Sequence, residues 1–343
     1  MGTTKNFLRG TFFLIILFVI FSYVSEVFAR KWDVQKYVDN FYEQPEDSID
    51  VLFLGASGFG TGVSPLILWE EAGFTSFTRA IGAQQASMTY YYLLESLEYQ
   101  HPDVVVLDAY RLIRHNKFED LEVSYRRSYE PLKFSIIKLR SLFDITSDSD
   151  LDTFISFLFP FFRYHTRWPE LERADFEFNN YDNDYSFLGQ FPYFNANPVE
   201  MPEDLMAPTD EEVEIHDNEL YYFEEMIRIC REKDIKVFLL VMPRLSLAKY
   251  SEYNTVKKFA DKHDLLFIDY NFPELMKVVD FNPATDMLDQ SHINPCGAVK
   301  FSRHLAEVLK NNFSLPDKRN DPDYFQWHSN LEKLKEQISQ NCN

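Results

Sequence analysis

Cysteine is scarce in this chain, which has only Cys230, Cys296 and Cys342 among its 343 residues. Three cysteines at these spacings indicate neither a disulfide framework nor a set of metal ligands. No CxxC or HExxH motif is present either, so the sequence predicts no metal and no cofactor. A domain with a large core can be exported without cross-links, so the scarcity does not exclude an extracellular location.

Basic residues are also in short supply, with 34 Lys and Arg against 54 Asp and Glu, which gives a net charge of −20. A phosphate backbone is bound through a basic footprint, so we expect no nucleic-acid partner. A charge of this size keeps an exposed protein soluble. The hydrophobic content of 45% and aromatic content of 17% exclude a disordered chain.

The chain has one long apolar run, at its N-terminus. Lys5 and Arg9 precede residues 12–24, and weaker apolar character continues for five residues more. The unbroken part matches the core of a cleaved signal peptide, whereas residues 7–29 together are long enough to cross a bilayer as a tilted helix. We favour an uncleaved signal-anchor at residues 1–31, which predicts a single-pass membrane protein with an extracytoplasmic body. Cleavage would make the protein a secreted one.

From residue 48 onward the pattern is α/β, because short apolar runs typical of buried parallel strands alternate with amphipathic helices. The alternation predicts a doubly wound parallel sheet between two helical layers, a flavodoxin-like fold over residues 48–315. We expect a linker helix within residues 32–47 and a polar, peripheral tail at residues 316–343. Thr209 is expected to cap a helix that ends near Lys233. The predicted strands are residues 50–54, 104–107, 237–241 and 265–268.

An irregular, aromatic-rich stretch interrupts this alternation at about residues 113–208. It is too long for a structureless loop in a compact domain, so we predict an inserted subdomain or lid with helical pieces. His165, Arg167 and Trp168 within it are candidates for lining a cleft, and are equally well explained as residues that hold the insertion in place.

Residues with chemistry to offer follow the predicted strands, at the edge where the carboxyl ends of parallel strands meet. Ser57 lies in a small-residue turn after the first strand, where its hydroxyl would stand at the sheet edge beside free N–H groups. Asp289 precedes His292 by three residues in a loop before the last helix, a spacing that allows it to orient the imidazole. Gly82 and Gln84, in the loop after the next region of sheet, are candidate oxyanion donors.

Each signal is common when taken singly, and a loop Asp-x-x-His is more often a surface pair than a catalytic dyad. Their order around one parallel sheet is specific. On these motifs the sequence resembles the SGNH/GDSL hydrolase superfamily, and within it a membrane-anchored bacterial branch that includes the D-alanyl-lipoteichoic-acid transfer protein and the alginate O-acetylation proteins. The resemblance spans roughly residues 47–112 and 235–309, with a weaker likeness at 164–175.

The resemblance implies that Ser57 is the nucleophile, that Asp289 and His292 complete the triad, and that the loop from Gly82 to Gln84 supplies oxyanion N–H groups. Two positions depart from the family pattern. Relatives often have histidine after the serine, where this chain has Gly58. The asparagine of the third family block is not evident, and Asp108 stands near its place. The candidates for contacts with the oxyanion or the substrate are Gly58, Gly82, Gln84, Asp108 and Asn294.

The implied chemistry is acyl transfer through a serine ester, in which His292 takes the proton of Ser57 and Asp289 stabilises the imidazolium. The acyl group then passes to water in an esterase, or to a glycan hydroxyl in an O-acyltransferase. Export and the resemblance favour a cell-envelope polysaccharide or polymer, or an acylated small molecule, as the substrate. A multi-pass membrane acyltransferase is the partner that the resemblance implies. Pro243 and Arg244 also lie at this edge by topology, where a substrate contact or a simple turn explains them equally well.

Two other functions stay open. A polymer-binding scaffold that keeps the fold with a weakened site would account for Gly58 and the missing asparagine. Residues 55–60 also look like the phosphate loop of a short-chain dehydrogenase, and Tyr-x-x-x-Lys pairs begin at Tyr129 and Tyr253. Against the dehydrogenase, Pro131 breaks the helix of the first pair, the second pair comes too late, and no acidic residue ends a second strand at the expected distance.

Overall fold

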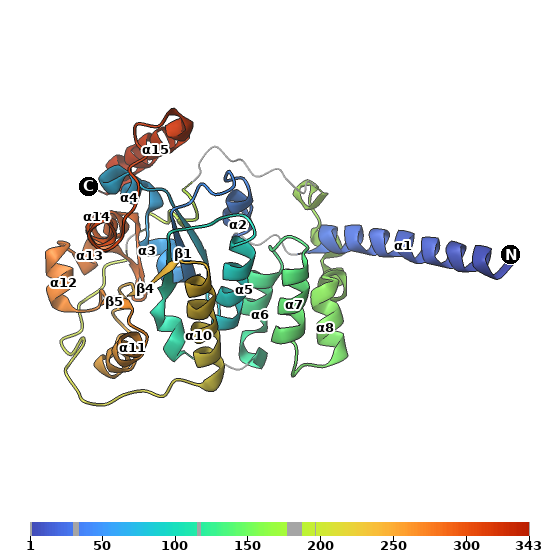
Figure 1. Cartoon of the computed structure of the whole chain (residues 1–343), viewed down its shortest axis with the longest axis horizontal. Coiled ribbons are helices and arrows are strands. Elements are labelled where there is room, and N and C mark those ends of the chain that lie inside the picture. The colour runs from blue at the N-terminus through green and yellow to red at the C-terminus, as the bar shows by residue number, and fades with distance from the viewer. Residues whose placement is uncertain (1, 30–33, 115–117, 177–186, 196, 343) are drawn as a thin grey trace.

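The structure, a computed structural model, describes residues 2–29, 34–114, 118–176, 187–195 and 197–342 (Figure 1). The α-helices are α1 (Gly2–Phe28), α2 (Gln35–Tyr42), α3 (Ser57–Gly62), α4 (Pro65–Ala72), α5 (Ala86–Ser96), α6 (Phe118–Tyr129), α7 (Ile136–Ile145), α8 (Leu151–Leu158), α9 (Phe161–Tyr164), α10 (Asp217–Glu232), α11 (Tyr250–Lys262), α12 (Pro273–Val278), α13 (Pro283–Asp286), α14 (Pro295–Asn312) and α15 (Phe325–Asn341). The 3-10 helices are η1 (Ala109–Ile113), η2 (His165–Glu170), η3 (Arg173–Phe176) and η4 (Pro322–Tyr324). The strands are β1 (Val51–Ala56), β2 (Ser76–Ile81), β3 (Val104–Asp108), β4 (Lys236–Val241), β5 (Leu266–Asp269), β6 (Met287–Asp289) and β7 (His292–Ile293).

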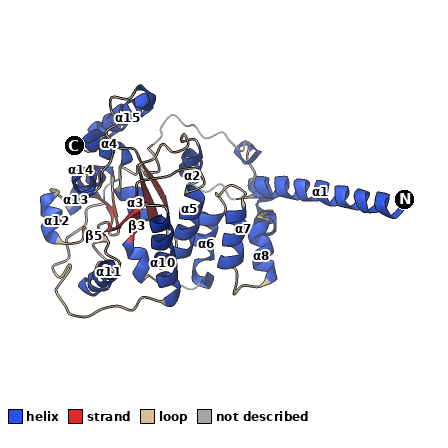
Figure 2. Cartoon of the chain, in the orientation of Figure 1, coloured by secondary structure: helices blue, strands red, loops and turns tan. Residues whose placement is uncertain are grey.

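A five-stranded sheet in the order β2-β1-β3-β4-β5 forms the centre of the domain, and every pair in it is parallel (Figure 2). This order is that of doubly wound flavodoxin-like folds, so the predicted α/β fold is confirmed. Strand β2 was not among the predicted strands. Thr78 and Arg79 interrupt its apolar pattern, and both are nevertheless buried. Arg79 is neutralised there by Glu95 of α5, at 2.8 Å.

Alternate residues of the strands support different helical layers. Leu52 and Leu54 of β1 pack into one core, which α5 and α10 also build. Phe53 points into a second core, which α3 and α14 complete. Figure 1 shows α5 and α10 on one side of the strands and α12 and α14 on the other. Because the sheet is covered on both faces, only the strand ends are available for chemistry.

Helices α6 to α9 form the predicted insertion, and Figure 1 places them beside α5, toward α1. The side chains of Ser135 and Asp150 accept N–H bonds at the starts of α7 and α8, as helix caps do. Tyr91 of α5 donates to Asp144 of α7 at 3.0 Å. The insertion is therefore a packed helical layer. Helix α1, which projects from it, is long and apolar enough to cross a membrane.

The C-terminal segment is not the peripheral tail that we expected. Trp327 and Leu331 of α15 are buried, and the Trp327 ring lies 5.1 Å from the ring of Trp69 in α4. A disulfide joins Cys296, in the first turn of α14, to Cys342 beyond the end of α15. The cysteine spacing did not indicate this disulfide, because the fold brings together two residues that are 46 positions apart in sequence.

The expected helix cap at Thr209 is also wrong, because α10 begins only at Asp217. The Thr209 carbonyl accepts a hydrogen bond from Asn254 of α11 at 2.7 Å. The Val213 N–H donates to the Thr255 hydroxyl, also on α11, at 2.8 Å. The acidic segment thus runs along α11, and these contacts replace the helical bonds.

Candidate active site

The turn after β1 and the turn after β2 lie side by side at the carboxyl edge of the sheet. Ala56 is paired with Ile81 at the ends of these parallel strands. The next residues, Ser57 and Gly82, therefore leave the sheet as neighbours. Ser57 is the first residue of α3, whose first-turn N–H groups have no acceptor within the helix.

Ser57, His292 and Asp289 form a hydrogen-bonded chain at this edge. The Ser57 Oγ lies 2.7 Å from His292 Nε2. On the other side of the ring, His292 Nδ1 lies 2.9 Å from Asp289 Oδ2 and 3.0 Å from Oδ1. An Nδ1–H that donates to the carboxylate leaves the Nε2 lone pair free to accept the hydroxyl proton. The structure thus brings together the three predicted residues in the geometry of nucleophile, base and orienting acid.

The surroundings of Asp289 favour its charged form, which can stabilise a protonated His292 ring. Partial burial raises the pKa of this carboxyl, but the Ser291 N–H at 2.7 Å and the His292 ring lower it by more, so the net pKa lies below its usual range. The side chains of His292 and Asp289 are 25% and 51% exposed, so a substrate can reach the triad from solvent.

Gly55 allows β3 to approach the end of β1, just before Ser57, closely. A Cβ on Gly55 would lie 2.2 Å from the Cβ of Asp108, so no other residue fits there without displacing the strand. The Asp108 carboxylate accepts the Ala56 N–H and the Tyr110 N–H, each at 3.2 Å. Asp108 therefore holds the residue before Ser57. A carboxylate has no N–H to offer an oxyanion, so it does not replace the missing asparagine as a donor.

Arg244, in the loop after β4, occupies the space beside Gly58. A Cβ on Gly58 would lie 2.9 Å from Arg244 Nη2, so a larger residue at this position would require the guanidinium to shift. The guanidinium stacks on the Tyr110 ring, 3.9 Å from its centroid, and Nη2 lies 3.8 Å from Asp108 Oδ2. Within the part of the chain that the structure describes, the guanidinium donates no hydrogen bond. The Arg244 guanidinium, a nearly buried positive charge whose N–H groups donate no hydrogen bond to the described residues, therefore lies beside Gly58, next to Ser57.

The other oxyanion candidates differ in what they can donate. The Gly82 N–H has no hydrogen-bond acceptor among the described residues and lies next to Ser57. The Gln84 side chain is fully buried, and its amide donates to Thr89 Oγ1 at 3.1 Å. Asn294 caps α14, since its Oδ1 accepts two N–H groups of the first turn at 3.0 and 3.1 Å. Gln84 and Asn294 are thus committed to structural bonds, and Gly82 is not.

A cavity of about 560 Å³ borders Asp289. It lies between the end of the insertion and the loops after β4 and β6. Its other lining residues are Asn197, Pro198, Val199, Glu200, Pro202, Leu245, Ser246 and Gln290. The insertion therefore forms one wall beside the triad, as a lid or substrate wall would.

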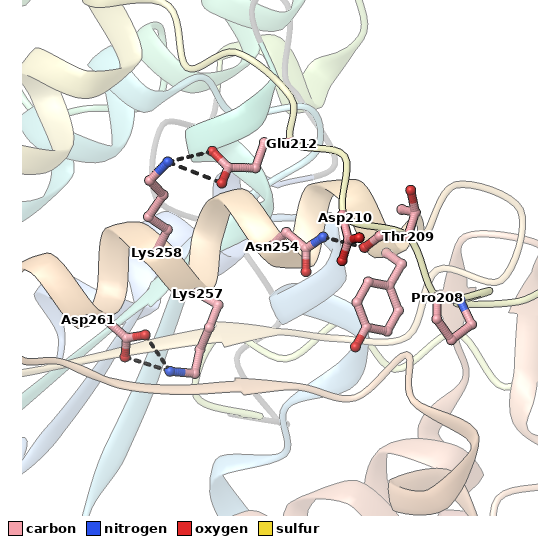
Figure 3. Close-up of a pocket in the computed structure, with 9 residues that line it drawn as sticks. Pro208, Thr209, Asp210, Glu212, Asn254, Lys257, Lys258 and Asp261 are labelled. Carbon is pink, nitrogen blue, oxygen red and sulfur yellow. Dashed lines mark hydrogen bonds and ion pairs between the residues drawn. The ribbon is translucent and has the colours of Figure 1, made fainter.

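A larger hollow of about 720 Å³ lies on α11, away from the triad residues (Figure 3). Its charges are paired with one another: Lys257 contacts Asp261 at 2.5 Å and Lys258 contacts Glu212 at 2.8 Å. The figure shows these side chains directed toward their partners. Because its two lysines are paired with carboxylates, the hollow is a weaker candidate for the active site than the edge of the sheet.

The predicted cleft residues His165, Arg167 and Trp168 lie at the end of α1 instead. Arg167 Nη1 donates to the carbonyls of Phe28 and Ala29, each at 2.8 Å, and so satisfies the C-terminal end of that helix. Its Nη2 contacts Asp175 at 3.1 Å. Of the two explanations for this cluster, the contacts of Arg167 support the structural one.

The dehydrogenase alternative fails on topology. Dinucleotide-binding sheets have the order 3-2-1-4-5-6, whereas this sheet has the order β2-β1-β3-β4-β5. Tyr129 ends α6, so Lys133 is not on the same helix. Lys257, the partner of Tyr253 in the second pair, is bound to Asp261. Of the glycines in residues 55–60, Gly55 belongs to β1, and Gly58 and Gly60 belong to α3.

No protein-family profile and no curated protein sequence matches the chain. Among solved structures, a protein of Bacteroides fragilis described as an acylhydrolase is 12% identical, with 82% of this chain and 98% of that chain covered and a TM-score of 0.38. A gut microbial diltiazem-metabolizing enzyme is 13% identical, with 78% and 48% covered and a TM-score of 0.28. At these scores neither likeness supports a functional argument, which therefore rests on the geometry of the site.

Proposed function

We propose that this chain is an extracytoplasmic serine esterase or O-acyltransferase that acts on a cell-envelope polysaccharide or polymer through an acyl-enzyme at Ser57. The observation that carries the proposal is the continuous chain from Ser57 Oγ to His292, at 2.7 Å, and from His292 to Asp289, at 2.9 Å. A serine hydroxyl becomes a useful nucleophile when an oriented base takes its proton, and this chain supplies that base.

In the proposed reaction, Ser57 Oγ attacks the ester carbonyl carbon while its proton passes to His292 Nε2. The carbonyl oxygen becomes an oxyanion, for which the nearby donors are the Gly82 N–H, the first-turn N–H groups of α3 and the guanidinium of Arg244. Collapse of the intermediate breaks the ester bond, and the alcohol leaves with the proton from His292. Water or a sugar hydroxyl then attacks the acyl-enzyme by the same steps in reverse.

The location and substrate follow from different features. The disulfide between Cys296 and Cys342 suits an oxidising compartment outside the cytoplasm. Helix α1 suits a membrane anchor, and the family resemblance points to an envelope polymer and to a multi-pass acyltransferase as partner. The cavity beside Asp289 provides an open site at which a polymer could be accepted.

Acyl-enzyme formation tests the proposal. We expect the chain, mixed with p-nitrophenyl acetate and quenched in acid, to gain the mass of one acetyl group on the peptide that contains Ser57. Ser57→Ala should gain none, and Ser251→Ala, a control on α11, should behave as the parent does. Release of nitrophenol without a Ser57 adduct in the parent would contradict the mechanism.

A non-catalytic scaffold is the second candidate, because Asp108 provides a carboxylate where relatives have a donor amide. A folded protein that binds envelope polysaccharide but forms no adduct would favour the scaffold. If the protein is active, adding oligosaccharide acceptors distinguishes the two proposed activities. A transferase yields acylated sugar, and an esterase yields only free acid.

A further inference from the structure

Helix α1 does not project freely along its whole length, because its C-terminal half is packed against the insertion. The Phe18 and Phe159 ring centroids lie 6.0 Å apart, and the Phe21 ring stacks on Phe162 at 6.0 Å. Phe28 contacts Phe161 at 5.1 Å. These contacts join α1 to the turn after α8 and to the start of α9.

The length of α1 determines how deep in a bilayer the rings in contact with it would lie. The apolar segment from Thr4 to Phe28 has 25 residues. At about 1.5 Å per residue it is about 37 Å long, while the hydrocarbon core of a bilayer is about 30 Å thick. About 7 Å of the helix, or about five residues, can therefore protrude if the helix spans the bilayer. Phe21 and Phe18 lie seven and ten residues before the end of α1, so both remain in hydrocarbon even if the whole excess protrudes toward the domain.

We infer that a wedge formed by residues 159–162, which are the turn after α8 and the first two residues of α9, is inserted into the bilayer beside α1, so that the protein is held by a wedge as well as by a helix. The inference rests on the membrane-anchoring part of the proposed function. Rings that contact Phe18 and Phe21 must share their depth. The occupant of this apolar surface is therefore lipid.

The surface around the wedge is consistent with this position. The large apolar side chains exposed on the described part of the insertion include Phe134, Ile136, Phe143, Leu151, Phe162, Trp168 and Phe176. Although the chain has a net charge of −20, residues 126–176 contain eight basic and eight acidic residues. This part of the molecule is thus not repelled by an anionic membrane surface as the rest is.

A cavity of about 560 Å³ lies in the seam between α1 and the insertion. Phe18, Phe157 and Phe159 are among its apolar lining residues, while Lys138 and Glu130 are among the polar ones. A lining that combines apolar and charged side chains suits a lipid, which has an acyl chain and a polar headgroup.

The wedge also determines the position of the triad relative to the membrane surface. Figure 1 shows α1 leaving the domain at one end of its long axis and α3 and α14, which adjoin the triad, toward the other end. With α1 in the bilayer, the site is held away from the lipid surface. A polymer that extends from the membrane fits this position better than a lipid within it.

Depth-dependent quenching tests the wedge in the full chain. Three single tryptophan substitutions are placed in phosphatidylcholine vesicles that carry brominated acyl chains, and the fluorescence of the parent, with its native tryptophans, is subtracted. Phe162→Trp reports the wedge, Phe13→Trp reports the exposed side of α1, and Phe325→Trp reports an exposed position on α15.

We expect the added fluorescence to be quenched for Phe162→Trp and Phe13→Trp and to persist for Phe325→Trp. Quenching of Phe13→Trp alone would overturn the wedge while leaving the anchor and the enzymatic proposal intact. Absence of quenching at both positions would overturn the anchoring and the wedge together, without bearing on the acyl-enzyme at Ser57.

Discussion

His292 holds a hydrogen bond on each ring nitrogen, and the two bonds have different functions. Nε2 faces Ser57, the proposed nucleophile, while Nδ1 is held by Asp289. The second bond selects the tautomer that makes the first one productive. Loss of the Asp289 carboxylate charge should therefore reduce the rate of ester hydrolysis while leaving the fold intact.

For Asp289→Asn we expect kcat for ester hydrolysis to fall by roughly 10³- to 10⁴-fold, because the amide favours the wrong imidazole tautomer. The side chain is half exposed, so the thermal midpoint should remain close to that of the parent. Steady-state kinetics and a melting curve on the same preparation check both statements. A variant with parental kcat would remove Asp289 from the mechanism.

A second carboxylate at the sheet edge, Asp269, should show itself through the pH dependence of stability. Burial raises the pKa of Asp269 to about 6, against the lowering effect of hydrogen bonds from Asn271. Between the unfolded pKa near 3.8 and the folded value, the folded state keeps a proton that the unfolded state releases. Stability from this group therefore falls as the pH rises through this window, and stays lower above it.

Asp269→Asn removes this cost while keeping an oxygen for Asn271. We expect the variant to be more stable than the parent at pH 8, by about 1 to 3 kcal/mol, with the difference shrinking toward pH 4. Urea unfolding at both pH values measures it. A difference that is equal at the two pH values would show that ionisation of Asp269 is not the cause.

The triad could be predicted from sequence because each member has a local signature: a small-residue turn after a strand for Ser57, and the Asp-x-x-His spacing for Asp289 and His292. The position of Arg244 against Gly58 could not, because it depends on β4 lying next to β3 and on an arginine that no motif marks. Gln84 was attractive as a residue type, but the burial of its amide against Thr89 is a packing result.

At the scale of elements, prediction succeeded where the apolar pattern was regular. Strands β1, β3 and β4 are continuous apolar runs, whereas β2 hides a buried arginine whose charge is balanced by Glu95. Helix α15 was missed because few of its residues are apolar, and the packing of Trp327 against Trp69 of α4 depends on a partner that is distant in sequence. In both cases the partner that makes the element stable is distant in sequence.

The disulfide that links α15 to α14 should make a measurable contribution to the free energy of unfolding. It closes a loop of 46 residues, for which restriction of the unfolded chain amounts to roughly 4 kcal/mol, with typical measured values of about 2 to 4. We expect the double variant Cys296→Ser, Cys342→Ser to lose about that amount in urea unfolding. Cys230→Ala, a change at the buried free cysteine, controls for altered thiol content. A double variant as stable as the parent would show that the cross-link does not fasten the helix.

At the scale of the whole molecule, the proposed function separates membrane attachment from chemistry. Helix α1 and the insertion form one end of the molecule, and the carboxyl edge of the sheet forms a site toward the other end (Figure 1). This arrangement lets loops at the edge change their chemistry without loss of the anchor. The proposed wedge also accounts for the exposed aromatic residues of the insertion.

The central claim is that Ser57 is a nucleophile activated by His292, and a fluorophosphonate probe tests it most directly. Because such probes react with activated serines, peptide mapping of the treated full-length chain should find the adduct on Ser57. The adduct should be lost in Ser57→Ala, strongly reduced in His292→Ala and retained in Ser251→Ala. A folded parent protein that stays unlabelled, or an adduct that persists after Ser57→Ala, would contradict the account.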